Sequence, residues 1–406
     1  MSSLKIARRN IWRNKRRTLI TAASVFFAVF FAVIMRSMQL GTYAEMIKSV
    51  VSAYTGHIQI HKTGYWEDKI INNTFRKNPK LEHEIAEIPG IKNIVPRLES
   101  FALASYGEQT KGSLLIGINP EKENLMTKLS DKLTSGKFLV NNDRGVLVSE
   151  KLAVFLKITI GDTLVLMGQG YHAATAAGKY PVKGIIHLNS PNLNNKIIYI
   201  NLPTAQELYS APDMLSSLSI IIDNSDNLEK IKEEITAKIN TKNYEIMTWK
   251  EITPELNQAI QSDNVSGQFM LGILYMIVGF GILGTIVMMT AERKKEFGVM
   301  IAIGMKKTKL ARIIFIETVL LGSVGIFFGF LFSLPVIFYF AKSPIPITGD
   351  AGKAYESFGF DPVIAFSTHP HFMISQVLVV LCIVIIAYIY PFNSILKTDP
   401  VKSMRN

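Results

Sequence analysis

Four apolar stretches, each long enough to cross a lipid bilayer as a helix, constrain this 406-residue chain more than any other feature of its sequence. A helix needs about 20 residues to span a hydrocarbon core of about 30 Å, where no water satisfies an open backbone. The four stretches contain a single charged side chain, Glu317, and cover residues 18–35, 268–291, 313–341 and 372–392. We therefore predict an integral membrane α-helical protein with four transmembrane helices and a large soluble insertion between the first two.

The first apolar stretch raises the alternative of a cleaved signal peptide, because seven basic residues precede it. Its 18 residues exceed the apolar core of such peptides, which is about 7–15 residues long. The chain then continues with Arg36-Ser37-Met38-Gln39, which contains no small-x-small cleavage pattern. We expect a retained membrane anchor.

The distribution of basic residues predicts the orientation of the helices. Segments 1–17, 292–312 and 393–406 hold 17 of the 44 lysines and arginines but only three of the 32 acidic residues. Lysine and arginine favour the cytoplasmic ends of transmembrane helices, and four spans place these three segments on one side. We expect a multi-pass inner-membrane protein with both termini in the cytoplasm and residues 41–266 in the periplasm.

The same distribution explains the net charge of +12. The positive excess belongs to segments that flank the membrane, so it indicates topology and contact with membrane lipids, and no nucleic-acid partner is expected. The single cysteine, Cys382, lies in the fourth apolar stretch. The outer domain is therefore expected to fold without a disulfide of its own.

The insertion at 41–266 mixes helix and strand patterns, which predicts an α+β domain. Residues 55–61 alternate polar and apolar as a strand does, while 81–88 and 227–239 have the period of amphipathic helices. Further short strands are expected at 91–95, 113–118, 145–149, 163–167, 182–186, 197–200 and 218–222. Because strands cluster at about 110–200, we predict a β-rich lobe within an α+β lobe. Residues 168–180, rich in small side chains, predict either a long hairpin tip or a flexible loop.

Two apolar stripes flank this domain. Val50 and Tyr54 lie four residues apart after the first span, and Leu256 and Ile260 lie four apart before the second. We predict that these stretches extend the spans and pack together as a stalk. Two unrelated surface helices remain the alternative.

No pattern in the sequence indicates a catalytic or metal site. Each Gly-Lys pair is followed by Phe, Tyr or Ala, so the chain lacks the Ser or Thr of a P-loop and is expected to bind no ATP itself. His57 and His61 share a strand face with Gln59 but lack a third ligand, so we expect a solvated strand face. Glu317 is expected to be a structural anchor near the cytoplasmic face, where it either snorkels toward the interface or pairs with Arg312 or Lys309, and a proton relay is the alternative.

The connection between the second and third spans is the most informative segment. Phe297, Met300 and their apolar neighbours form one side of a short amphipathic helix, and Glu292, Arg293 and Glu296 form the polar side. Gly304 is expected to end this helix. Such a helix at the membrane surface suits docking to a soluble partner, and a plain turn between spans is the alternative.

At this segment the chain resembles the FtsX-like, MacB-type (type VII) family of ABC transporter permeases. The family signature after the second span is matched by Thr290, Glu292, Arg293, Glu296, Phe297, Gly298, Met300, Ala302 and Gly304. The start at 7–18 and the end, with Tyr390-Pro391 and Asp399-Pro400-Val401, also resemble the family, although 392–394 depart from it. Residues 54–60 are similar to a stretch of lipoprotein-releasing LolC/LolE-type permeases.

The resemblance implies a permease subunit that is not itself an enzyme. ATP and Mg would be bound by two separate ABC ATPase subunits, which contact the coupling helix through Glu292, Arg293, Glu296, Phe297, Gly298, Met300 and Gly304. A second permease copy or a paralogue completes the complex, and the periplasmic domain performs mechanical work. Lipoprotein release from the inner membrane is the expected function. The alternatives are a MacB-like efflux permease with a periplasmic adaptor or chaperone, an FtsX-like regulator of wall hydrolases, and a membrane-anchored sensor without an ATPase.

These expectations divide the chain into nine segments. The chain begins with a basic amphipathic helix at 1–17 and the first span at 18–40, and the periplasmic domain follows at 41–266. The second span at 267–291 leads through the coupling helix and connection at 292–312 into the third span at 313–341. A periplasmic loop at 342–371, the fourth span at 372–392 and a cytoplasmic tail at 393–406 complete the chain.

Overall fold

The computed structural model describes residues 15–239 and 241–399, which divide into two compact units. The membrane unit comprises Met1–Ala44, Ile260–Pro346 and Val363–Asn406, and the soluble unit comprises Glu45–Ala259 and Ile347–Pro362. Most of the basic helix predicted at 1–17, and the family-like ending after Asp399, lie outside the described residues.

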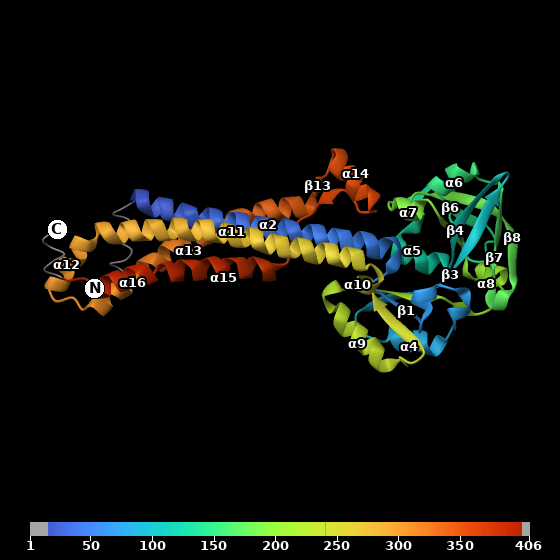
Figure 1. Cartoon of the computed structure of the whole chain (residues 1–406), viewed down its shortest axis with the longest axis horizontal. Coiled ribbons are helices and arrows are strands. Elements are labelled where there is room, and N and C mark those ends of the chain that lie inside the picture. Colours follow the sequence, from blue (N-terminus) through green and yellow to red (C-terminus); the bar gives the residue numbers. More distant parts are fainter. Residues whose placement is uncertain (1–14, 240, 400–406) are drawn as a thin grey trace. The chain divides into compact units, whose positions relative to one another are not determined.

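Long helices form the membrane unit (Figure 1). Four helical stretches are long and apolar enough to cross a bilayer, as the sequence predicts. The fourth is interrupted after Ala387, so the predicted span 372–392 is covered by two helices. The elements of this unit are α2 (Lys15–Val50), α11 (Pro254–Glu292), α12 (Lys294–Ala302), α13 (Lys307–Lys342), β13 (Ile345–Pro346), β14 (Val363–Ile364), α15 (Pro370–Ala387) and α16 (Ile389–Leu396).

Close packing of α2 against α13 depends on two glycines. A methyl group added at Gly325 would lie 2.6 Å from the carbonyl oxygen of Ala22, and one at Gly329 would lie 2.6 Å from that of Phe26. Small residues at this spacing let two helix backbones approach in the absence of a hydrophobic driving force. Around this contact, one buried core joins side chains of α2, α11, α13 and α15.

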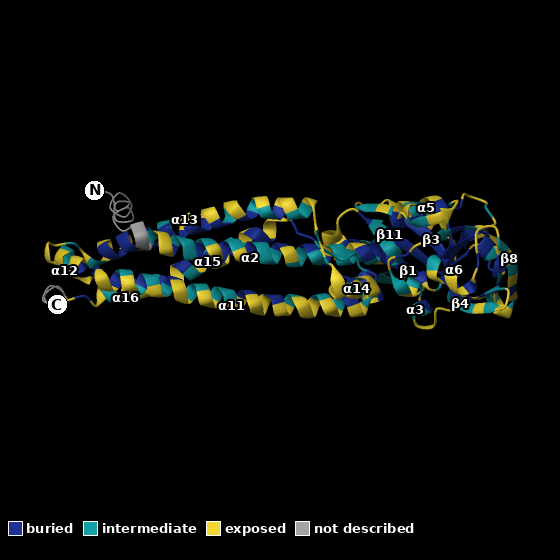
Figure 2. Cartoon of the chain, turned by 90° about the horizontal axis from the view of Figure 1, so that it is seen from above, coloured by how far each residue is buried: buried dark blue, intermediate teal, exposed yellow. Residues whose placement is uncertain are grey.

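The outer faces of these helices remain largely uncovered, as the exposed positions along α11 in Figure 2 show. Phe269, Ile273 and Phe280 of α11 are each more than half exposed, although they are apolar. Because an apolar surface of this kind is stable in lipid, the pattern supports insertion of the unit into a bilayer.

At the far end of the apolar stretch, a polar clamp joins α2 to α11. Arg36 donates to Asn264 at 2.7 Å, and the Tyr43 hydroxyl donates to the Asp263 carboxylate at 2.5 Å. Gln39 also donates to Asp263. The two helices that flank the soluble insertion are thus joined by hydrogen bonds on the membrane side of the predicted stalk.

A mixed ten-stranded sheet forms the centre of the soluble unit, in the order β12-β1-β11-β3-β4-β9-β6-β8-β5, with β7 pairing β3 and β8. Its strands are β1 (Ile58–Lys62), β3 (Ile91–Tyr106), β4 (Gln109–Ile118), β5 (Leu133–Gly136), β6 (Val146–Ser149), β7 (Thr163–Gln169), β8 (Thr175–Ile186), β9 (Ile197–Asn201), β11 (Ser217–Ile222) and β12 (Tyr244–Thr248), and a separate pair is β2 (Phe75–Arg76) with β10 (Met214–Leu215). The helices are α3 (Tyr65–Asp68), α4 (Pro79–Ala86), α5 (Pro120–Thr127), α6 (Glu150–Leu156), α7 (Pro191–Asn194), α8 (Leu202–Leu208), α9 (Leu228–Lys238), α10 (Trp249–Ile252) and α14 (Gly349–Ser357), with single turns η1 (Val51–Thr55), η2 (Ile71–Asn73), η3 (Leu129–Lys132), η4 (Tyr171–Ala173) and η5 (Ser225–Asn227).

One long strand links the two predicted lobes. The 16-residue β3 pairs with β11 near its start and with β4 and β7 farther along, so one sheet runs through both lobes. Inside it lies a fully buried ion pair, in which Arg97 approaches Glu123 of α5 to 2.5 Å. Arg97 also donates to the carbonyl oxygen of Tyr54, which joins the end of the first long helix to the sheet.

Two segments have clearer roles in the structure than in the sequence. Residues 168–180 form the tip of a hairpin, because β7 and β8 stay paired up to Gln169 and Thr175, and the flexible-loop alternative is wrong. Residues Ile347–Pro362, predicted as part of a loop between the last two spans, belong to the soluble unit. Asp361 accepts a hydrogen bond from Asn189 at 2.7 Å, so this loop contacts the β-rich part of the unit.

Candidate functional site

The predicted coupling segment forms a short helix, α12, between two long ones. α11 ends at Glu292, Arg293 precedes the first turn of α12, and α12 ends at Ala302. Gly304 then adopts a φ of +100°, a conformation that side chains disfavour, and it reverses the chain before α13. The helix is therefore shorter than the predicted 292–304, and Glu292 belongs to the preceding helix.

Phe297 anchors α12 to the rest of the membrane unit. Its side chain is 1 % exposed and packs in a cluster with Leu310, Ile314 and Ile395. The neighbouring Gly298 is also buried, and Met300 borders the cluster. Burying a phenylalanine contributes about 2–3 kcal/mol, so this contact holds α12 against α13 and α16.

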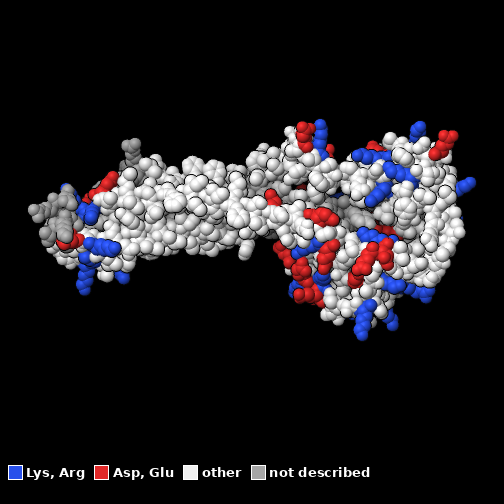
Figure 3. Space-filling model, viewed as in Figure 1, with Lys and Arg blue, Asp and Glu red and all other residues white. Residues whose placement is uncertain are grey.

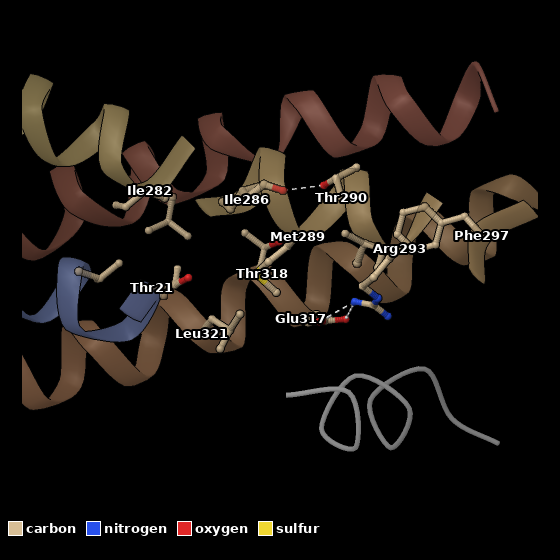
Figure 4. Close-up of a pocket in the computed structure, with 14 residues that line it drawn as sticks. Thr21, Ile282, Ile286, Met289, Thr290, Arg293, Phe297, Glu317, Thr318 and Leu321 are labelled. Atoms are coloured by element: carbon tan, nitrogen blue, oxygen red, sulfur yellow. Dashed lines mark hydrogen bonds and ion pairs between the residues drawn. The ribbon is translucent and has the colours of Figure 1, made fainter. Parts of the chain in front are cut away.

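An ion pair provides the second anchor and differs from the prediction. Arg293 was expected on the polar surface, but its side chain is 8 % exposed and approaches Glu317 of α13 at 2.8 Å. The predicted basic partners of Glu317 were Arg312 and Lys309, whereas the described partner is Arg293 (Figure 4). The predicted pairing with Arg312 or Lys309 was wrong, because Arg293 reaches Glu317 from the connection that precedes α12.

The outward surface of α12 mixes charged and apolar side chains. Lys294, Lys295 and Glu296 are exposed, as is Glu292 at the end of α11. Figure 3 shows charged side chains at this end of the membrane unit, beyond the white apolar part of its helices. Ile303, just after α12, is 81 % exposed, and Val299 is 43 % exposed. A surface that combines exposed apolar residues with charges is typical of protein–protein interfaces.

A narrow crevice with a volume of about 20 Å³ lies behind this segment. Its walls come from α2, α11, α12, α13 and α15, and Figure 4 shows Thr21, Met289, Thr318 and Leu321 around it, with the Arg293–Glu317 pair at one end. The lining is mostly apolar.

The predicted stalk residues are placed individually, and their mutual contact stays a prediction. Val50 ends α2, and Tyr54 lies in η1, where its hydroxyl donates to the Glu99 carboxylate. Leu256 is 7 % exposed near the start of α11. Ile260 belongs to the membrane unit, while the other three belong to the soluble unit.

The histidine prediction was wrong about exposure. β1 lies inside the sheet, and His61 and Gln59 are each 2 % exposed. The His61 ring contacts the carbonyl oxygen of Ser216 at 2.9 Å, and burial lowers the pKa of His61 to about 4. Within residues 15–239 and 241–399, no group of three metal-ligating side chains is present.

Profiles of two known protein families match this chain. The profile described as "MacB-like periplasmic core domain" matches residues 18–238, which is more than half of the chain. The profile described as "FtsX-like permease C-terminal" matches residues 268–400, which include α12 and the last two long helices.

Two relatives align with this chain along its whole length. The "Uncharacterized ABC transporter permease YknZ" of Bacillus subtilis (strain 168) is 20 % identical over 100 % of this chain and 99 % of its own length. The "Macrolide export ATP-binding/permease protein MacB" of Mannheimia succiniciproducens is 21 % identical, and the chain spans 61 % of that longer protein. The crystal structure of the extracellular domain of YknZ matches 48 % of this chain and 100 % of its own, at 18 % identity and a TM-score of 0.35.

Proposed function

The chain belongs to the family of ABC transporter permeases that combine a MacB-like periplasmic core domain with an FtsX-like C-terminal region, and we propose that it couples ATP hydrolysis by separate ATPase subunits to movement of its soluble unit. Two ATPase subunits would bind ATP and Mg, and a second permease copy or a paralogue would complete the complex. The permease contributes no catalytic residue.

The observation that carries this proposal is the anchoring of α12. Phe297 and Arg293 hold the helix to α13 from its inner side, while Glu292, Glu296, Val299 and Ile303 face outward. An ATPase that binds the outer side would therefore push on α13 through both contacts. Arg293 acts in this proposal as a positioning residue, because its guanidinium is buried and pairs with Glu317 of α13.

The same proposal assigns the compartments. Both termini and α12 lie in the cytoplasm, where basic residues gather, and the soluble unit lies in the periplasm of a cell with an inner and an outer membrane. α2 and α11, joined by the polar clamp around Asp263, enter the soluble unit directly and would carry the movement to it.

For the substrate, we propose release of lipoproteins from the inner membrane. Residues 54–60, which resemble lipoprotein-releasing permeases, lie where the first long helix ends and β1 begins. There the Tyr54 hydroxyl and carbonyl oxygen are bonded to Glu99 and Arg97 of β3. Movement of the first helix would thus reach the central sheet through these residues.

Export of small molecules with a periplasmic adaptor is the second candidate. It is favoured by the match to the MacB-like core domain over residues 18–238 and by the relative named for macrolide export. In that case the soluble unit would engage the adaptor, and no lipoprotein would be its substrate.

Charge reversal on the outer side of α12 tests the coupling. A Glu292→Lys/Glu296→Lys variant is expected to lose copurification with the ATPase, or to lose substrate-dependent ATP turnover, because charge-assisted contacts contribute about 1.5–3 kcal/mol each. Insertion should be unaffected, since the change adds positive charge to a side that is already positive. The matched control reverses two exposed acids of the soluble unit, Glu67 and Asp68.

A second variant alters the outer side of α12 without disturbing Arg293. Glu296 lies 3.3 Å from Arg293, so its reversal also disturbs the inner anchor. Ile303→Ser changes only an outward side chain that is 81 % exposed. If both variants retain wild-type ATPase binding and turnover, α12 is a simple connector and the coupling proposal is wrong.

Depletion in the native host separates the two substrates. Retention of lipoproteins in the inner membrane, with unchanged sensitivity to exported compounds, supports lipoprotein release. Normal lipoprotein sorting with increased sensitivity to such compounds supports export instead.

A further inference from the structure

A basic and aromatic hollow lies at one edge of the soluble unit, apart from α12 and the long helices. Its volume is about 450 Å³, and it opens to solvent. The end of β1, the pair β2 and β10, the tip of the β7–β8 hairpin and the start of β12 all contribute to it. Its lining consists of Lys62, Thr63, Thr74, Phe75, Arg76, Tyr171, Met214, Lys242, Asn243 and Tyr244.

The charge of this hollow has one sign. Lys62, Arg76 and Lys242 line it, and no carboxylate does. Among the described residues, neither Lys62 nor Arg76 forms an ion pair, in contrast to the paired lysines of α9 and α10. Two acids, Asp213 and Glu245, adjoin lining residues in sequence, and neither lines the hollow. The Glu245 carboxylate accepts hydrogen bonds from the amides of Gly64 and Trp66. An anionic group would therefore find cations available for pairing.

The floor of the hollow is apolar. Phe75 and Met214 are 6 % and 8 % exposed, and the Phe75 ring packs edge-on against Tyr244 at 5.4 Å between centroids. Tyr171 adds a third ring from the hairpin tip, where its amide bonds to the carbonyl oxygen of Tyr209. Aromatic side chains flanked by cations are suited to a ligand that has both apolar and anionic groups.

Beside the hollow runs an open strand edge. β12 ends the order of the central sheet and pairs only with β1 in the described chain. Its ladder includes the bonds from Thr63 to Asn243 and from Trp249 to His57, so residues 243, 245, 247 and 249 direct their backbone groups toward β1. By alternation, the N–H and C=O groups of Tyr244 and Ile246 point to the open edge.

We propose that the β12 edge and this hollow together bind an extended, acidic segment of a partner protein in the same compartment. The segment would pair its backbone with Tyr244 and Ile246 and thereby add a strand to the sheet. Its acidic side chains would meet Lys62 and Arg76, and an apolar side chain between them would rest on Phe75. This inference goes beyond the coupling function and is independent of which substrate the complex moves.

Peptide binding to the full-length protein in nanodiscs of zwitterionic lipid tests the proposal. The probe is a fluorescein-labelled ten-residue peptide in which every second residue is, in turn, Glu and Phe, with Ser or Thr between them, so that acidic and apolar side chains lie on the same face of the strand. Its affinity is measured by fluorescence anisotropy. We expect saturable binding that weakens at least tenfold between about 50 mM and 500 mM salt, because exposed charges are screened. A peptide with Lys in place of every Glu should not bind.

Charge reversal of the hollow gives the matched comparison. Lys62→Glu/Arg76→Glu should weaken binding at least tenfold. Lys137→Glu/Lys157→Glu, which changes two exposed lysines outside the hollow to the same net charge, should leave it unchanged. Equal affinities for the two double variants would overturn the proposal.

Strand addition at β12 is tested by changing the protein backbone and, separately, the peptide backbone. Ile246→Pro removes an outward N–H without removing a bond to β1, and proline is tolerated on edge strands. Peptides N-methylated at every second residue, in either phase, test the same pairing without altering the protein. Ile246→Pro and one methylation phase should each abolish binding. Equal binding by both phases, or competition by inorganic phosphate at the peptide's own concentration, would show a small-anion site and refute strand addition.

Discussion

Replacing one member of the Arg293–Glu317 pair should loosen α12 more than any surface change on that helix. The two side chains are 8 % and 4 % exposed, and Arg293 donates to both carboxylate oxygens of Glu317, at 2.8 and 2.9 Å. Arg293→Met leaves the Glu317 carboxylate without this partner in an apolar setting. Breaking a buried ion pair from one side costs about 3–5 kcal/mol.

Two further variants isolate the pair from its surroundings. Arg293→Met/Glu317→Leu removes both charges, and its cost should be well below that of Arg293→Met alone, because no buried charge loses its partner. Glu296→Gln changes the second carboxylate beside Arg293. The Glu296 side chain is 44 % exposed and lies 3.3 Å from Arg293, so this variant should lower the free energy of unfolding by no more than about 1 kcal/mol.

Stability and coupling are read out together. Thermal unfolding of the permease in detergent should rank the variants, with Arg293→Met lowest, the double variant intermediate and Glu296→Gln near wild type. ATP turnover of the complex should become independent of substrate in Arg293→Met, because α12 no longer transmits force to α13. If Arg293→Met unfolds at the temperature of Glu296→Gln and stays coupled, the pair does not anchor α12.

Three other predictions concern topology, the stalk and pH. In a Cys382→Ser background, a cysteine at Asn142 should react with a membrane-impermeant maleimide added from outside and one at Lys306 should not; labelling of both from one side would refute the four-span topology. A cysteine pair at Val50 and Leu256 should form a disulfide on oxidation, which requires α-carbons within about 7 Å, and failure of every pair across the two stripes would exclude a stalk. Burial lowers the pKa of His61 to about 4, below its value of about 6.5 in the unfolded chain. The contribution of neutral His61 to the free energy of unfolding is therefore complete above pH 6.5 and is lost as the pH falls toward 4. The loss should reach about 2 kcal/mol at pH 5, and His61→Gln should show a smaller drop in unfolding temperature between pH 8 and pH 5.

The sequence alone was sufficient for features that depend on composition along one segment. Four apolar helices follow from the lack of charge over about 20 residues, since a bilayer excludes unpaired charges and open backbone. Strands were predicted at 197–200 and 218–222 because both runs are rich in Ile, and the observed strands β9 and β11 cover them. The glycine at 304 marked the end of the short helix for a similarly local reason.

Contacts between distant segments were decided only by the tertiary structure. The partner of Glu317 is 24 residues away, and Arg97 finds Glu123 from another element, so no local period indicates either pair. His61 was predicted on a solvated face because its strand alternates, yet the rings of Tyr65 and Trp66 pack against it and it is buried. Alternation in a sequence separates the two faces of a strand, but it does not show which face meets solvent. Only the packing of neighbouring elements determines that, because a polar side chain is also stable in the interior when it finds a hydrogen-bond partner there.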